Sequence, residues 1–275
     1  IYNGPIDKIC NITINKFTAC SSVDNYIKIY QENINDEKFI EIQKIEIDNK
    51  KISSINVLND NNTLIIATND NILQIYQDKI GGIPMQNYMK TKYELVESFE
   101  TLHTNKINYI LHITNEKIIT ASDDSTLKIW DKERNYDTLI GHNDSVNKVI
   151  ELDNSYLCSA SNDGNIIIWE NDNKYKLKQK INAHDFSIRG LVYLSDGDII
   201  SVSIDETIKI WQRNKFNLYI NKKIYKEHEG GITDIVLIDD DIFITCSWDK
   251  SIKIWYMMND EDSDEETNEN EKRIL

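Results

Sequence analysis

The stretch Ser122-Asp-Asp-Ser-Thr-Leu-Lys-Ile-Trp-Asp131 decides the fold, because close copies of it recur along the chain. In it, Asp124 lies in a turn-like cluster, and an apolar run follows and ends at Trp130. Six segments share that ending, and each has an Asp six residues before its terminal aromatic residue. The segments are Tyr26–Tyr30, Ile72–Tyr76, Thr126–Trp130, Asn165–Trp169, Thr207–Trp211 and Ser251–Trp255, and the aspartates are Asp24, Asp70, Asp124, Asp163, Asp205 and Asp249. Such self-similarity at a period of roughly 40–50 residues indicates a repeat architecture.

A histidine lies 21 residues before the Asp in each of the last four copies. An apolar pair three residues apart follows it, as in Val146 and Val149, and then a turn cluster. A β-branched run such as Ile199-Ile-Ser-Val202 precedes the Asp, and a further apolar segment such as Tyr175 to Ile181 fits between one Trp and the next His. β-Branched runs bounded by turn residues predict strands. The sequence therefore predicts an all-β fold with four antiparallel strands in each unit.

These units resemble WD repeats, with Gly141-His142 at the Gly-His pair and Trp130-Asp131 at the Trp-Asp pair of that family. The resemblance implies a β-propeller over residues 1–256, with six recognisable blades that end near residues 30, 76, 130, 169, 211 and 255. It is weaker in the first two units, where Tyr30 and Tyr76 replace the Trp, and where Tyr2 and Asp48 fall near the expected His.

Residues 257–275 are predicted to form an acidic, disordered tail, because the run Asp260-Glu-Asp-Ser-Asp-Glu-Glu266 is a block of like charge. The tail is interpreted as a segment that keeps the protein soluble, and the alternative is that it attracts and binds a basic partner.

The resemblance also raises the question of how a ring would close. Propellers of this family pair an N-terminal strand with three C-terminal strands, but only Ile1 and Tyr2 precede the first unit. The last blade is therefore expected to lack its outer strand, which leaves an open edge. Three interpretations remain: six blades of seven, with a preceding blade outside this sequence; a strand donated by a partner, as in the open scaffolds of vesicle coats and nuclear pores; or six blades with an open seam. The first is preferred.

A His, a Ser or Thr, an Asp and a Trp recur together in the last four units. These tetrads are His103, Thr120, Asp124, Trp130; His142, Ser159, Asp163, Trp169; His184, Ser201, Asp205, Trp211; and His228, Thr245, Asp249, Trp255. An enzyme needs one activated site, so four equal copies favour a structural role over a hydrolase. The resemblance implies a hydrogen-bond chain from Asp through His and hydroxyl to Trp. No residue pattern predicts a catalytic, metal or cofactor site.

The resemblance further implies a partner-binding surface at three positions per unit: three and five residues after the His and one before the Asp. Carried over, these positions give Lys51, Lys106, Asn108, Asp123, Asn147, Asn162, Arg189, Ile204, Thr233 and Trp248. Trp248 is predicted to dominate binding, and packing on its own blade is the alternative. Lys51, Lys106 and Arg189 favour an acidic or phosphorylated peptide, unless they are simply solvated charges. The connection from Asp78 to Lys92 is a second docking candidate.

The net charge of -15 argues against direct binding to nucleic acid or to an anionic membrane, so nucleic acid is expected only through a complex. The four cysteines show no metal-ligand or disulfide spacing, which predicts free thiols and a cytoplasmic or nuclear location. We expect a non-catalytic scaffold or adaptor within a multiprotein complex. Three alternatives are a ribosome-assembly or RNA-processing subunit, a ubiquitin-ligase substrate receptor, and a cytosolic iron–sulfur delivery adaptor. The ubiquitin-ligase hypothesis is disfavoured, because the family's ligase-docking motif has Arg three positions after the repeat Trp, and Glu133 stands there after Trp130.

Overall fold

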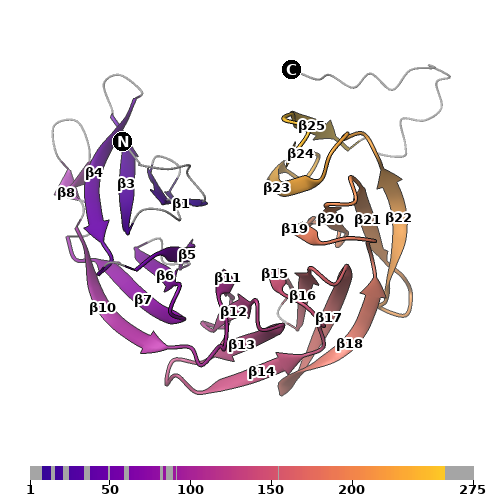
Figure 1. The fold of residues 1–275 in the computed structure, drawn as a ribbon, viewed down its shortest axis with the longest axis horizontal. Helices are drawn as coiled ribbons and strands as arrows, with labels where there is room; N and C mark the ends of the chain where they lie inside the picture. The colour runs from indigo at the N-terminus through magenta and orange to yellow at the C-terminus, as the bar shows by residue number, and fades with distance from the viewer. Residues whose placement is uncertain are drawn as a thin grey trace. The chain divides into compact units, whose positions relative to one another are not determined.

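The computed structural model describes residues 8–13, 16–20, 25–33, 38–48, 50–58, 62–80, 83–84, 89–90, 92–153 and 155–257. The predictions for the acidic tail beyond residue 257, for the turn at Asp24, and for residues 81–82, 85–88 and 91 of the connection from Asp78 to Lys92 lie outside these residues. Every regular element in the described ranges is a β-strand (Figure 1). They contain no helix of a length and apolar character that could cross a membrane.

The strands form antiparallel sheets in chain order, which confirms the predicted all-β fold. Five sheets have four strands, and the sixth has three among the described residues. Sheet 1 holds β1 (Lys8–Thr13), β2 (Lys16–Cys20), β3 (Tyr26–Glu32) and β4 (Phe39–Glu46). Sheet 2 holds β5 (Ile52–Val57), β6 (Thr63–Thr68), β7 (Ile72–Asp78) and β10 (Tyr93–Glu100). Sheet 3 holds β11 (Ile107–His112), β12 (Ile118–Ser122), β13 (Thr126–Trp130) and β14 (Tyr136–Ile140).

The second half of the chain repeats this order. Sheet 4 holds β15 (Val146–Asp153), β16 (Tyr156–Ser161), β17 (Asn165–Asp172) and β18 (Lys174–Asn182). Sheet 5 holds β19 (Ile188–Tyr193), β20 (Ile199–Ser203), β21 (Ile208–Arg213) and β22 (Tyr219–Tyr225). Sheet 6 holds β23 (Ile232–Asp239), β24 (Ile242–Ser247) and β25 (Ile252–Tyr256). A short pair, β8 (Ile83–Pro84) and β9 (Met89–Lys90), lies in the connection before β10.

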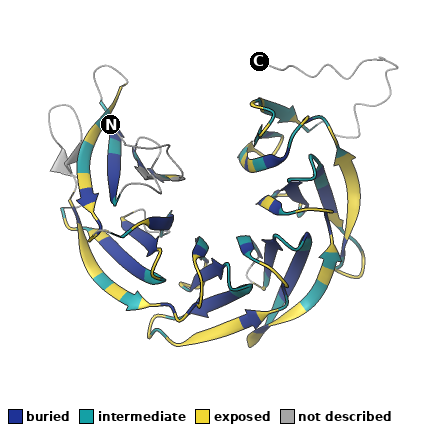
Figure 2. Cartoon of the chain, viewed as in Figure 1, coloured by how far each residue is buried: buried dark blue, intermediate teal, exposed yellow. Residues whose placement is uncertain are grey.

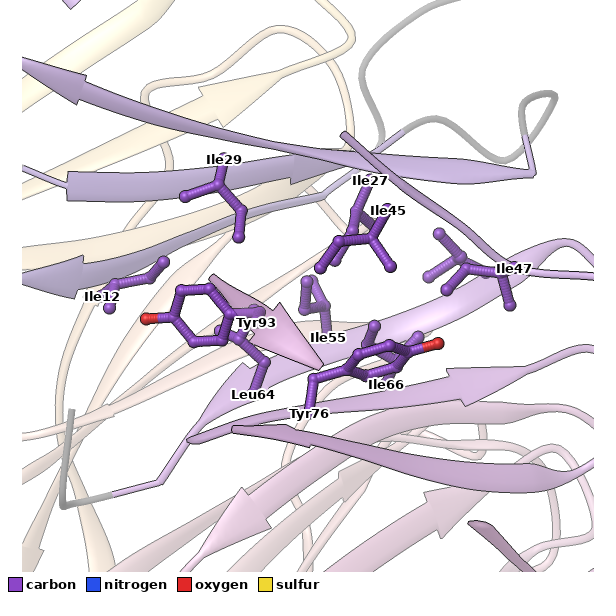
Figure 3. Packing of buried hydrophobic residues seen from close by; sticks show 11 residues of the cluster. Ile12, Ile27, Ile29, Ile45, Ile47, Ile55, Leu64, Ile66, Tyr76 and Tyr93 are labelled. Carbon is purple, nitrogen blue, oxygen red and sulfur yellow. The ribbon is translucent and has the colours of Figure 1, made fainter. Parts of the chain in front are cut away.

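Two compact units divide the chain, Ile1–Ile140 with sheets 1 to 3 and Gly141–Leu275 with sheets 4 to 6. Within each unit, consecutive sheets pack face to face through aliphatic side chains. In the first unit, Ile27 and Ile29 of β3 pack in one cluster with Leu64 and Ile66 of β6 (Figure 3). The second strand of sheet 2 and that of sheet 5 each have a neighbouring sheet of the same unit on both faces, so β6 and β20 are buried along their whole length, while the outer strands are largely exposed (Figure 2).

Glutamine side chains link the outer strands of neighbouring sheets. Gln179 of β18 donates from Nε2 to the Tyr219 carbonyl oxygen at 2.8 Å, and its Oε1 accepts from the Tyr219 backbone N–H at 2.8 Å. Gln43 of β4 makes the same two bonds with Tyr93 of β10, at 2.9 and 2.8 Å. The amide thus copies the pattern of a backbone ladder, and it satisfies the first residue of the next outer strand.

Candidate functional site

The four predicted tetrads form the same hydrogen-bond chain, although the contact of His142 Nδ1 with Asp163 is longer, at 3.3 Å, than its equivalents at 2.7–2.8 Å. In sheet 5, His184 Nδ1 lies 2.8 Å from Asp205 Oδ2, and His184 Nε2 lies 2.7 Å from Ser201 Oγ. Trp211 Nε1 donates to the same Ser201 Oγ at 2.8 Å. The other three sheets repeat these contacts with His103, Thr120, Asp124, Trp130; His142, Ser159, Asp163, Trp169; and His228, Thr245, Asp249, Trp255. Each hydrogen-bond chain joins the loop before the inner strand and the turn that carries the Asp to the second and third strands of the sheet.

In the hydrogen-bond chain of sheet 5, burial and hydrogen bonding together determine the protonation states of His184 and Asp205. Burial lowers the pKa of His184, and the hydrogen bond to Asp205 opposes this shift without cancelling it. Burial alone would raise the pKa of Asp205, but hydrogen bonds from His184 and Thr207 hold that pKa well below its ordinary value. A neutral His184 then donates from Nδ1 to the carboxylate, accepts the Ser201 proton at Nε2, and leaves Ser201 Oγ to accept from Trp211. Each side-chain polar group that takes part in this hydrogen-bond chain thereby has a partner.

These pKa shifts predict that acid destabilises the fold. The pKa of His184 and that of Asp205 both lie lower in the folded protein than in the unfolded chain, so the unfolded chain binds protons first as the pH falls. The stability contributed by His184 is present above about pH 6.5 and is lost as the pH falls toward its folded pKa, and the Asp205 contribution is lost below about pH 4. Urea unfolding at several pH values checks this. The stability difference between wild type and His184→Gln should shrink from pH 7.5 to pH 5; a constant difference would contradict the shift at His184.

The tetrad hydroxyls are out of reach of a substrate. Ser159, Ser201, Thr120 and Thr245 are all 0% exposed. A nucleophile must meet its substrate, so the geometry provides hydrogen bonding inside each sheet and no accessible catalytic group at these positions.

In sheet 2 the place of the histidine is taken by a lysine. Lys50 Nζ lies 2.8 Å from Asp70 Oδ2, whereas Asp48, expected near the His position, makes no such contact with the turn Asp. Tyr76 donates from its hydroxyl to Gln74 Oε1 at 3.1 Å, in the place of the Trp–hydroxyl bond. The weaker resemblance of this unit therefore reflects a different set of polar contacts around the same turn.

The predicted partner-binding positions lie at one end of each sheet, where the second and third strands are joined by the turn that carries the Asp. The residue before the Asp donates its backbone N–H to the residue three after the His. This bond joins Trp248 to Gly231 at 2.9 Å, and its equivalents join Asn69 to Lys51, Asp123 to Lys106, Asn162 to Ser145 and Ile204 to Ser187. The predicted positions are thus neighbours in space within each sheet, at what we call the turn ends of the sheets.

The position five residues after the His coincides with a β-bulge in the inner strand. The register shifts between Ile188 and Gly190 in β19, so Arg189 has no partner residue in the β20 ladder. The same shift occurs around Ser53 in β5, Asn108 in β11, Asn147 in β15 and Thr233 in β23. A bulge leaves one residue out of the ladder and redirects its side chain. The bulges therefore supply one side chain per sheet for the turn-end surface.

Most of these bulge side chains are bound internally. Asn108 donates from Nδ2 to Asp123 Oδ1 at 2.6 Å, and Thr233 donates to the Cys246 carbonyl oxygen at 3.2 Å. Asn147 donates from Nδ2 to Asn162 Oδ1 and to the Ile188 carbonyl oxygen, both at 2.8 Å. Arg189 is exposed, and within the described residues it makes no ion pair or side-chain hydrogen bond.

Trp248 projects from the turn end of sheet 6. Its side chain is 66% exposed, and it is separate from the Trp of its tetrad, Trp255. A Cβ placed on Gly231 would lie 3.0 Å from Trp248 Cε3 and 3.1 Å from Ile204 Cδ1. The indole therefore lies against the Gly231 backbone beside Ile204, with most of its surface in solvent. Phe186, which the sequence reasoning missed, is 62% exposed in the turn before β19; its place two residues after His184 was the available signal.

In the first unit, Lys51 and Lys106 are exposed at the turn ends of sheets 2 and 3. The backbone N–H of Lys51 donates to Asn69 Oδ1 at 3.2 Å, and that of Lys106 donates to Asn105 Oδ1 at 2.8 Å. Their positive charges are available to a ligand of this unit.

Comparison with known families identifies the repeat. The model described as WD domain, G-beta repeat matches residues 94–131, 134–170, 175–212 and 220–256. These four segments correspond to the units with tetrads, and together they cover more than half of the chain. A search of curated proteins finds no match to this chain. With its repeated four-stranded sheets and the matched segments, the chain belongs to the WD-repeat family of β-propeller proteins.

Proposed function

We propose that the protein is a non-catalytic adaptor that binds another protein or a peptide through the turn ends of its sheets. WD-repeat domains generally mediate protein–protein interactions. The observation that carries the proposal is Trp248, a large aromatic side chain that is 66% exposed at the turn end of sheet 6. Large aromatic side chains on such surfaces supply much of the binding energy of protein interfaces.

In each unit, exposed cations at the turn ends favour an acidic or phosphorylated partner. Arg189, Lys51 and Lys106 are exposed cations on a chain of net charge -15. We further propose a cytoplasmic or nuclear location. Cys158 is a buried thiol whose pKa is raised by burial, and Cys246 is half-buried and outside any disulfide. Persistent thiols suit a reducing compartment.

Purification from native cells tests the adaptor proposal. The tagged full chain and a Trp248→Ala, Arg189→Ala double variant would be isolated side by side, and bound proteins identified by mass spectrometry. A defined set of partners that the folded variant loses supports the proposal. An identical set with both proteins places docking elsewhere. The identity of the partners would also distinguish ribosome assembly, ubiquitin ligation and iron–sulfur delivery, which remain predictions.

A second candidate interaction is a strand donated to sheet 6. In sheets 4 and 5, one face carries isoleucines such as Ile166 and Ile208, each 1% exposed because the next sheet covers them. The equivalent residue in sheet 6, Ile252, is 64% exposed, and Tyr256 at the other end of β25 is 60% exposed. Among the described residues, β25 pairs only with β24. We propose that a strand from a partner protein pairs with the outer edge of β25, because an edge strand offers unpaired backbone groups.

Lys223 indicates the chemistry of that strand. It faces Ile210 in the ladder, as Gln179 faces Ile168, and it therefore occupies the position from which Gln179 links the next outer strand. A lysine there favours an acidic residue at the start of the added strand. Hydrogen exchange checks this: partner binding should slow exchange of the β25 amides by at least about tenfold. Lys223→Glu should reduce that protection and Lys176→Glu, on the exposed side of β18, should leave it unchanged; equal protection in both variants would contradict the role of Lys223.

A further inference from the structure

The turn ends of sheets 4 and 5 are joined by a closed polar network. Asn147, at the bulge of β15, reaches the Ile188 carbonyl oxygen of the next sheet at 2.8 Å. Asn162 Oδ1 accepts from Asn147 at 2.8 Å and from Ser187 Oγ at 2.5 Å. In this network Asn147 and Ser187 both donate to Asn162 Oδ1, so the amides and the hydroxyl at this junction bind one another.

The junction of sheets 5 and 6 has different residues at the same three positions. Arg189 stands at the bulge in place of Asn147, Ile204 stands in place of Asn162, and Gly231 stands in place of Ser187. The replacements remove both the amide acceptor and the hydroxyl that close the network between sheets 4 and 5. The guanidinium is left exposed, without an ion pair in the described part of the chain.

Gly231 is required here for close approach. Its φ lies outside the left-handed region, so its backbone conformation does not call for glycine. A Cβ at this position would instead press on Trp248 Cε3 at 3.0 Å and on Ile204 Cγ2 at 3.1 Å. The glycine leaves room for the indole beside Ile204, at the junction of sheets 5 and 6. These four residues, Arg189, Ile204, Gly231 and Trp248, form what we call the junction patch.

We propose that the junction patch binds a short partner segment in which an anionic side chain is adjacent to a large apolar one. The guanidinium offers two parallel N–H donors to the oxygens of a carboxylate or a phosphate monoester. The neighbouring apolar side chain packs on Trp248 and Ile204. A cationic ligand is disfavoured, since Arg189 repels it. This inference rests on the proposed adaptor function and specifies the ligand of the same surface.

A peptide selection tests the inference with the full chain. Random dodecamers displayed on phage would be selected against the immobilised protein, and enriched sequences synthesised for fluorescence anisotropy. We expect enrichment of Asp or Glu next to Phe, Leu or Trp. Arg189→Ala should weaken binding roughly 10- to 100-fold. Replacing the peptide carboxylate with its amide should cost about as much, and the two changes together should cost little more than either alone.

Three comparisons make the result specific. Arg189→Lys keeps the positive charge but loses the two parallel N–H donors of the guanidinium, so it should bind with intermediate affinity. Gly231→Ser should weaken binding by displacing the indole of Trp248. Lys176→Ala, an exposed charge on β18, is the matched control and should bind as wild type does. A phosphoserine in place of the acidic residue would bind more tightly if phosphate is the preferred anion, and more weakly if carboxylate is.

The inference and the proposed function can fail separately. Enriched peptides that lack an acidic residue and bind Arg189→Ala normally, yet lose affinity for Trp248→Ala, would overturn the anionic ligand and leave the adaptor surface standing. Enriched peptides that ignore both substitutions, or a selection that enriches nothing, would overturn the ligand assignment together with the turn-end surface that it depends on.

Discussion

Trp248→Ala is expected to weaken binding of the partner by roughly 30- to 1,000-fold, or about 2–4 kcal/mol. The side chain is 66% exposed before binding, so a partner that covers it gains a large apolar area without first unpacking the core. One side of the indole is already in contact with the protein, because a Cβ on Gly231 would lie only 3.0 Å from Trp248 Cε3. The dissociation constant would be measured with a purified partner or a selected peptide.

Phe216→Ala is the matched control for this prediction. Phe216 is 70% exposed, but it lies in the turn between β21 and β22, at the opposite end of β21 from Ile204. Both variants should unfold at the wild-type urea concentration, because neither side chain is part of the core. Equal affinity of wild type and Trp248→Ala would remove the indole from the interface, and an equal loss with Phe216→Ala would point to a nonspecific apolar effect.

His184→Ala is expected to lower the free energy of unfolding by about 3 kcal/mol. The substitution removes the group that joins Asp205 to Ser201, and it leaves a buried hydroxyl and a largely buried carboxylate each without one partner. It also opens a cavity beside Trp211, since His184 is only 4% exposed. The free energy would be taken from urea unfolding followed by tryptophan fluorescence.

Lys176→Ala serves as the control for stability, because its ammonium lies in solvent 4.0 Å from Asp172. Exposed pairs of this kind contribute little, so the control should stay within about 0.5 kcal/mol of wild type. His184→Ala within that same range would show that the tetrad of sheet 5 is dispensable for stability.

Much of the fold could be predicted because the spacing of the tetrads is set by strand lengths. The 21 residues from His184 to Asp205 span β19, β20 and the turns beside them, so a constant interval indicates a constant hairpin. Buried strands can also be predicted from the sequence: β20 is rich in β-branched residues, and all its residues are buried. The sequence could not show that Lys50 contacts Asp70 in sheet 2, because a lysine in a loop has many possible partners.

The sequence contained a signal for the bulges, although the sequence analysis did not predict them. Val146 and Val149 lie three residues apart, and in a regular strand they would face opposite sides of the sheet. Both are 0% exposed, and they pair with Ser161 and Ser159, which share one face of β16. Only an extra residue between them reconciles the spacing with the pairing. The arrangement around Gly231 was less accessible, because it depends on how Trp248 and Ile204, distant in sequence, approach one backbone position.

The bulges have a consequence for how such a chain can change its ligands. A residue outside the ladder can be exchanged without moving the register of its strand, so Asn147, Arg189 and Thr233 occupy equivalent places with unlike side chains. Selection can therefore act on one position per sheet while the interior remains constant. A repeat of this kind separates the residues that specify folding from those that specify recognition, and new specificities can arise by single substitutions.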